Sequence, residues 1–126
     1  MLAPWARLLA ETRAAVRGRL LAGEPPRLRD EDGREWRLEA DEESLAVLRD
    51  DRVRSEIFEA RGVVLPPDGL RIDPIHKRAM FVVRGGKPLV ITYWCDVCAI
   101  RTYSPGKCQC CQDETALDPR DPALDP

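Results

Sequence analysis

The sequence predicts a mainly β fold with a minor α contribution: a small barrel with one short helix, followed by a cysteine-rich hairpin. Short segments in which apolar and polar residues alternate are separated by turns rich in Asp, Gly and Pro. One short stretch has an apolar stripe at helical spacing. All five cysteines lie within residues 95–111. The length of 126 residues fits one domain with a small appendage.

The chain begins with residues 1–13, in which apolar side chains at helical spacing predict a short helix or arm. The residues from there to Gly23 can continue that helix or form a strand. We favour the strand, because apolar residues alternate with arginines there and because Gly18 would weaken a helix.

A hairpin and a short helix are expected next. An Asp-rich turn ending in Gly33 separates Leu28 from a strand that carries Trp36 and Leu38. Asp41 is a candidate N-cap, and it is followed by acidic residues in the first turn and by an apolar stripe of two leucines. These features predict one short helix after the hairpin.

The remaining segments are expected to be strands. The alternation over residues 53–64 predicts a strand, the sequence PPDG turns the chain, and residues 70–75 form the next strand, with Leu70 and Ile72 on one face. Two apolar runs on either side of Gly85 and Gly86 predict a hairpin, whose second strand runs directly into Cys95. The last ten residues contain three Asp-Pro pairs and no apolar face, which favours a disordered tail or an extended arm.

The order of strand, hairpin, short helix, strand, turn and strand resembles an OB-like fold over about residues 14 to 75, with the helix between the third and fourth strands. We therefore expect four parts. They are an N-terminal helix or arm over residues 1–13, an OB-like β domain over 14–88, a cysteine hairpin over 89–116 and a disordered tail over 117–126.

The cysteines form two C-x2-C pairs with nine residues between them. This is the spacing of a tetrahedral site with four thiolate ligands, because each pair forms a tight turn that points both sulfurs inward. Pro105 and Gly106 supply the turn that brings the pairs together. The expected ligands are Cys95, Cys98, Cys108 and Cys111.

This segment resembles the zinc ribbons, including the rubredoxin-like kind, over about residues 90 to 116. The resemblance implies a structural Zn²⁺ site. Such ribbons often have Gly or a small residue just after each pair, whereas Ala99 and Gln112 stand there in this chain. The whole chain resembles small bacterial proteins in which an OB-like domain precedes such a ribbon, a resemblance that implies a fold and no activity.

Other uses of the same cysteines remain open. Iron would use the same four sulfurs, so the sequence does not separate Fe from Zn²⁺. Disulfides would require an oxidising compartment and would leave one of five thiols unpaired. A redox C-x2-C pair would normally open a helix, and the residues after Cys98 make a poor one. Cys110 can be a spectator, an alternative ligand or an exposed reactive thiol.

Two further groups of residues are candidates for function. His76 is the only histidine and can serve as an accessory metal or redox residue, with Met80 as a soft ligand if the metal is copper. A binding face beside the cysteines would consist of Trp94, Arg101, Tyr103 and Lys107. A catalytic dyad would have to pair Cys110 with His76, and no phosphate-binding loop is present, so a binding module is favoured over an enzyme.

Charge and hydropathy limit the partners. The net charge is −2, which does not indicate a general nucleic-acid binder. The charges are uneven, with eight acids over residues 30–43 and seven Lys or Arg over residues 71–107. No apolar run approaches the length of a membrane span, and arginines interrupt the N-terminal segment where a signal peptide would need an apolar run. Reduced thiolates favour the cytoplasm, and the cell envelope stays open.

The sequence therefore predicts a non-enzymatic interaction module, stabilised by a four-cysteine zinc site and belonging to a larger assembly with a protein partner. The first alternative is a redox or metal-handling protein that uses the same cysteines. The second alternative is nucleic-acid binding by the basic half of the chain.

Overall fold

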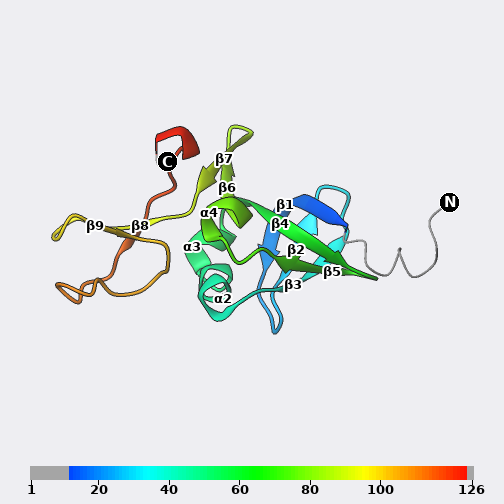
Figure 1. The fold of residues 1–126 in the computed structure, drawn as a ribbon, viewed down its shortest axis with the longest axis horizontal. Helices are drawn as coiled ribbons and strands as arrows, with labels where there is room; N and C mark the ends of the chain where they lie inside the picture. Colours follow the sequence, from blue (N-terminus) through cyan, green and yellow to red (C-terminus); the bar gives the residue numbers. More distant parts are fainter. Residues whose placement is uncertain (1–11, 125–126) are drawn as a thin grey trace.

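The computed structural model describes residues 12–124, and their strands form two sheets (Figure 1). The larger sheet contains β1 (Arg13–Leu21), β2 (Arg27–Asp30), β3 (Glu35–Glu39), β4 (Ile57–Leu65), β5 (Gly69–Ile72), β6 (Met80–Arg84) and β7 (Lys87–Val90). The smaller, C-terminal sheet contains β8 (Tyr93–Cys95), β9 (Ile100–Thr102) and β10 (Ala116–Leu117). The expected helix near the N-terminus lies almost wholly outside the described residues.

Five strands of the larger sheet close into a barrel. The neighbours run in the order β1, β2, β3, β5, β4, and β4 pairs back to β1. All of these pairs are antiparallel except β3 with β5, which is parallel. Two short helices, α2 (Glu42–Leu48) and α3 (Asp51–Arg54), connect β3 to β4. This topology confirms the mainly β, OB-like prediction, including the position of the helical segment.

Two glycines let the barrel strands approach closely. A Cβ atom on Gly18 of β1 would lie 1.8 Å from the carbonyl oxygen of Arg29, and one on Gly62 of β4 would lie 1.9 Å from that of Arg71. Any side chain at these positions would collide with the backbone of the neighbouring strand. The strand prediction around Gly18 is thus confirmed, and the glycine is needed for strand packing.

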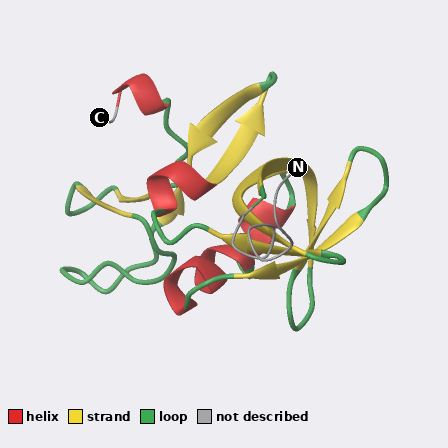
Figure 2. Cartoon of the chain, turned by 45° about the vertical axis from the view of Figure 1, so that its right-hand side comes forward, coloured by secondary structure: helices red, strands yellow, loops and turns green. Residues whose placement is uncertain are grey.

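The barrel interior and the helices share one apolar core. Phe58, Leu70 and Leu38 contribute from the strands, and Val47 and Val53 contribute from α2 and α3. Tyr93 of the C-terminal sheet belongs to the same cluster and is fully buried. In both ribbon views the helices lie between the barrel and the cysteine-containing region (Figures 1 and 2).

The helical region is larger than the sequence predicts. Asp41 caps α2 as expected, since its carboxylate accepts a hydrogen bond from the Ser44 N–H at 2.8 Å. The expected strand over residues 53–64 is wrong in its first part, because Val53 lies in α3 and β4 begins only at Ile57. Asp50 provides a second N-cap, which starts the additional helix.

The region around and after β5 differs from the prediction in three further respects. The strand expected over residues 70–75 is wrong in its last part, because β5 ends at Ile72. A short helix, α4 (His76–Ala79), precedes β6, although the sequence indicated no helix there. The hairpin at Gly85 and Gly86 is confirmed, with both glycines at positive φ of 59° and 78°. Its second strand does not run into the cysteines, because β7 ends at Val90 and β8 starts at Tyr93.

The expected disordered tail is wrong for residues 117–120. Leu117 pairs with Tyr93 in the C-terminal sheet. The N–H of Asp118 donates to the Thr92 carbonyl at 2.7 Å, and Arg120 and Val90 exchange two backbone hydrogen bonds. A 3₁₀ turn, η1 (Pro122–Leu124), follows. Backbone hydrogen bonds order this segment even though its sequence has no apolar stripe. Over residues 12–124, no helix is long and apolar enough to span a membrane.

Candidate metal centre

The four predicted ligands converge at one point in the C-terminal region. The Sγ atoms of all four cysteines lie within 4.8 Å of one another. The Sγ atoms of Cys95 and Cys111, one from each pair, lie 3.5 Å apart. Residues from the end of β8 and from the loop after β9 therefore form a single group of sulfurs, as the spacing predicts.

Each C-x2-C pair forms a tight turn, which we call a knuckle (residues 95–99 and 108–112). In the first knuckle the N–H of Cys98 donates to Cys95 Sγ at 3.4 Å. In the second, the N–H of Cys110 donates to Cys108 Sγ, also at 3.4 Å. The two turns are thus built alike, with the first sulfur of each pair accepting a backbone hydrogen bond.

The residue after each knuckle pair adopts the left-handed conformation. Ala99 has a φ of 53° and Gln112 has a φ of 67°, the only non-glycine residues with positive φ in the described part of the chain. These are the positions where zinc ribbons often have a small residue or Gly. The knuckle geometry therefore forms without glycine, at a cost of about 1 kcal/mol for each residue.

The sulfur geometry fits a tetrahedral metal. With metal–sulfur bonds of about 2.3 Å, the sulfurs of a tetrahedral zinc thiolate site lie about 3.8 Å apart. The Cys95 and Cys111 sulfurs lie 3.5 Å apart and all four sulfurs lie within 4.8 Å of one another, which is close to that value. Four protein sulfurs would complete the coordination shell of such a metal, an arrangement consistent with a closed structural site. Zn²⁺ and Fe both accept this donor set.

Backbone donors prepare one sulfur for metal binding. Hydrogen bonds from the N–H groups of Cys111 and Cys110 lower the pKa of the Cys108 thiol to about 7. In contrast, a hydrogen bond with the Cys110 thiol raises the pKa of Cys98. Metal binding must therefore displace protons, most readily from Cys108, which makes metal affinity pH-dependent.

The five cysteines differ in burial. Cys95 and Cys108 are buried, Cys98 and Cys111 are half-buried, and Cys110 is exposed. The four convergent sulfurs thus have one side covered by the protein and one side near solvent. Cys110 is the only cysteine outside the four-sulfur group, although its backbone and thiol contact members of that group.

A residue that the sequence analysis missed anchors the second knuckle to the barrel. Arg52 of α3 donates from Nη1 to the backbone carbonyl of Thr115 at 2.8 Å. Thr115 in turn donates from its N–H and its hydroxyl to the carbonyl of Gly106, just before the knuckle. No local sequence pattern indicates this contact, because Arg52 lies in a helix that is far from Thr115 in the sequence.

The predicted binding-face residues already make internal contacts. Arg101 lies 4.8 Å from the Trp94 ring centroid, and its Nη1 donates to Thr92 and to Asp118. Tyr103 has its ring 5.6 Å from His76 and 4.9 Å from the Lys77 ammonium. Lys107 is exposed and forms an isolated bridge with Glu114 through its backbone. Trp94, Arg101 and Tyr103 therefore help to hold the C-terminal sheet together.

His76 lies outside the sulfur group. Its Nε2 is 3.0 Å from the carbonyl oxygen of Ile91, and burial lowers its pKa. Its position on α4 connects that helix to the start of the C-terminal sheet. Met80 is fully buried in the barrel core.

Comparisons of the chain with protein-family models, with curated proteins and with solved structures gave no significant match. The function must therefore be argued from the two features that the structure establishes. These are a closed OB-like barrel and a group of four cysteines that can hold a metal ion.

Proposed function

We propose that the protein is a non-enzymatic interaction module, in which a zinc ribbon with one structural Zn²⁺ is attached to an OB-like barrel. The observation that carries this proposal is the convergence of four sulfurs from two matching knuckles. Its ligands would be Cys95, Cys98, Cys108 and Cys111. The need for reduced thiolates favours a cytoplasmic location.

Zinc would stabilise a region that has few contacts of its own. The strands β8, β9 and β10 contain only three, three and two residues. Such short strands do not form a stable sheet alone, so the free energy of metal binding would serve as folding free energy. The metal would then have a structural role, which explains why protein ligands would occupy all four of its coordination positions.

A protein partner is supported by the surface next to the site. Val97, inside the first knuckle, is 75% exposed, and Ile100 at the start of β9 is 38% exposed. The knuckle backbone presents these apolar side chains rigidly once the metal is bound. Exposed apolar residues on a rigid support are typical of docking surfaces in assemblies.

Metal analysis of the purified chain tests the zinc proposal. We expect one zinc per chain, a colourless protein, and four thiols that react only after denaturation or chelation. Cys95→Ser should lose the metal, whereas Cys110→Ser should retain it. A red protein with one iron per chain, or a pair of disulfides in the native state, would refute structural zinc.

The interaction proposal needs a separate test. Val97→Asp should keep the zinc and the fold, and should lose a partner that the wild-type chain retains on purification from its source cells. Ile57→Asp, on the barrel, is the matched control, because Ile57 is also an exposed apolar residue at 41%, and this variant should keep that partner. If the full chain retains no partner in stoichiometric amount, the proposed assembly role is wrong.

One observation favours the redox or metal-handling alternative. Cys110 is exposed and its thiol hydrogen-bonds to Cys98, so an oxidant that reaches Cys110 is next to a ligand sulfur. In that case, mild peroxide should release the metal from the wild-type chain faster than from Cys110→Ser. Equal release rates would assign Cys110 no redox role.

A further inference from the structure

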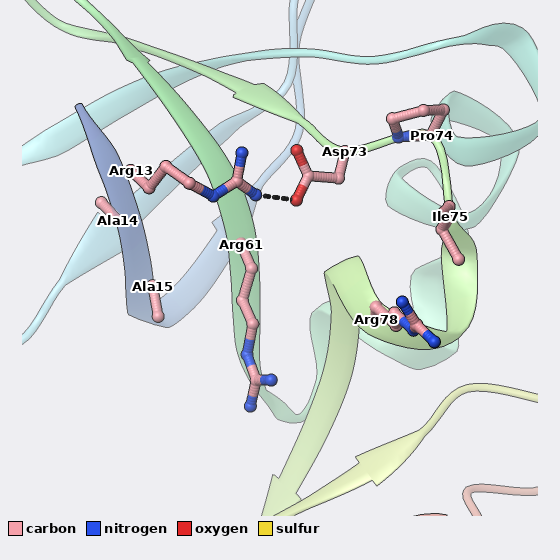
Figure 3. A pocket seen from close by; sticks show the side chains of 8 residues that line it. All are labelled: Arg13, Ala14, Ala15, Arg61, Asp73, Pro74, Ile75 and Arg78. Atoms are coloured by element: carbon pink, nitrogen blue, oxygen red, sulfur yellow. Dashed lines mark hydrogen bonds and ion pairs between the residues drawn. The ribbon is translucent and has the colours of Figure 1, made fainter. Parts of the chain in front are cut away.

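A cleft on the barrel, away from the cysteines in sequence, collects positive charge. Its volume is about 660 Å³, within the range typical of small-molecule sites. Residues from the start of β1, from β4 and from the segment between β5 and α4 line it (Figure 3). The charged residues are Arg13, Arg61, Arg78 and Asp73, so the lining holds three guanidinium groups and one carboxylate.

Arg61 is held in place at the wall of this cleft. Its Nε donates to the carboxylate of Glu59 at 2.6 Å, and its guanidinium lies 4.2 Å from the ring centroid of Phe81. Glu59 is buried, which fixes both partners. The contact with Glu59 uses the Nε–H, and so the Nη groups of Arg61 stay available to a ligand. A guanidinium fixed in this way loses little entropy on binding an anion.

Arg78 faces the same cleft from α4 and lacks a compensating anion. The side chain is exposed, and within residues 12–124 it makes no ion pair or hydrogen bond. Asp73, the one acid of the lining, is already paired with Arg13, as Figure 3 shows. The lining therefore has an excess of two positive charges.

The rest of the cleft is apolar and small. Ala14 and Ala15 lie along β1, and Ile75 is 55% exposed beside α4. This exposed isoleucine lies beside Arg78 and offers a contact surface to an apolar group attached to an anion (Figure 3). The cleft therefore offers guanidinium groups to an anion and an apolar surface to the group attached to it.

We propose that this cleft binds a small organic phosphate monoester, whose phosphate lies between Arg61 and Arg78 and whose apolar body contacts Ile75. A phosphate dianion matches the excess charge, and the planar fork of arginine donates two hydrogen bonds to its oxygens. The inference is independent of the metal site, since no cysteine lines the cleft.

Side-chain NMR of the full chain tests this site, using phenyl phosphate as the probe. Titration should shift the Nε–Hε signals of Arg61 and Arg78. Phenyl phosphate should bind more tightly than inorganic phosphate, whereas benzyl alcohol should not bind. Arg78→Ala should weaken binding about tenfold, and Asp73→Asn should strengthen it, because the competing carboxylate charge is removed.

Arg71→Ala is the matched control. The Arg71 side chain is also exposed, makes no ion pair or hydrogen bond within the described residues, and does not line this cleft. Its loss should change the affinity less than twofold. The proposal is wrong if Arg71→Ala and Arg78→Ala weaken binding equally, or if phenyl phosphate produces no shifts. It is also wrong if single-stranded oligothymidylate without a terminal phosphate displaces the probe, since phosphodiesters would then be the ligand.

Discussion

Arg52 and Thr115 connect the two sheets of the protein: Nη1 of Arg52 donates to the carbonyl oxygen of Thr115 at 2.8 Å. The same guanidinium pairs with Asp50 at 2.8 Å and lies 5.2 Å from the ring centroid of Tyr93. One side chain of α3 thus contacts its own N-cap, the first strand of the C-terminal sheet and the segment after the second knuckle. The metal site is thereby fixed relative to the barrel.

Replacing Arg52 should loosen this connection. Arg52→Met keeps the apolar stem but removes the hydrogen bond to Thr115 and the ion pair, so the free energy of unfolding should fall by about 1–2 kcal/mol. Urea unfolding measures this change. Arg54→Met, in the same helix, is the control and should cost much less, because within residues 12–124 the polar contacts of the Arg54 side chain go to the nearby Asp51 and Arg49. An equal loss for both variants would contradict the anchoring role.

Removing the metal should unfold the cysteine region and leave the barrel intact. The C-terminal sheet depends on the four ligands, whereas β4 is held by pairing with three other strands. After chelation, hydrogen exchange should accelerate for Ile100 and Thr102, while the amides of Phe58 and Ala60 stay protected. Uniform loss of protection would show that the barrel itself needs the metal.

Glycine after the first knuckle should stabilise the protein. Ala99 has positive φ, which glycine adopts without a steric penalty, so Ala99→Gly should raise the free energy of unfolding by about 0.5–1 kcal/mol. Thermal unfolding of the metal-bound protein measures the gain. Ala116→Gly, at an exposed position of β10, should destabilise instead. A loss of stability in Ala99→Gly would mean that its methyl group makes contacts that outweigh the strain.

Glu59 should make stability depend on pH in the acid range. Burial alone would raise the pKa of its carboxyl, but hydrogen bonds from Arg17 and Arg61 more than offset this and the pKa lies below its ordinary value of 4.5. The ionised form is therefore favoured by folding. Its contribution is present above about pH 4.5 and is lost as the pH falls through the lower folded-state pKa.

Glu59→Gln should accordingly reduce the free energy of unfolding at pH 7 by about 2 kcal/mol, and the difference from wild type should shrink below pH 4.5. Urea unfolding at several pH values provides the test. Glu35→Gln removes an exposed carboxylate that pairs with Arg27 and Arg29, and its effect should be much smaller. A difference that persists unchanged at pH 3 would show that Glu59 acts through packing alone.

Gly62 should tolerate no side chain. The Cβ of Gly62→Ala would overlap the Arg71 carbonyl oxygen at 1.9 Å, so β4 and β5 would have to separate at a cost of about 3 kcal/mol. Gly33→Ala is the control, because no atom lies within 4 Å of its added Cβ and only its positive φ of 85° opposes alanine. In chemical unfolding, the free energy of unfolding of Gly62→Ala should be far lower than that of Gly33→Ala. The reverse order would mean that the barrel accommodates the methyl group by shifting β5.

Local sequence determines much of the barrel. Alternation, turn residues and the Asp41 cap give β1 to β3, α2 and the glycine hairpin, because each depends on neighbours within a few residues. Alternation does not show which residues of β4 point into the barrel. In the structure Ile57 is 41% exposed, whereas Phe58 is fully buried. Alternation shows that two faces exist, but burial decides which face points inward.

The cysteine spacing by itself determined that four sulfurs can meet, because each knuckle is a local turn and one hairpin joins the two knuckles. Only the tertiary structure decided what supports them. Arg52 reaches Thr115 across 63 residues, Asp118 pairs with Thr92, and Arg61 and Arg78 line one cleft formed by separate elements. Such contacts depend on how the barrel closes, and no local periodicity encodes the distance between residues that far apart in the chain.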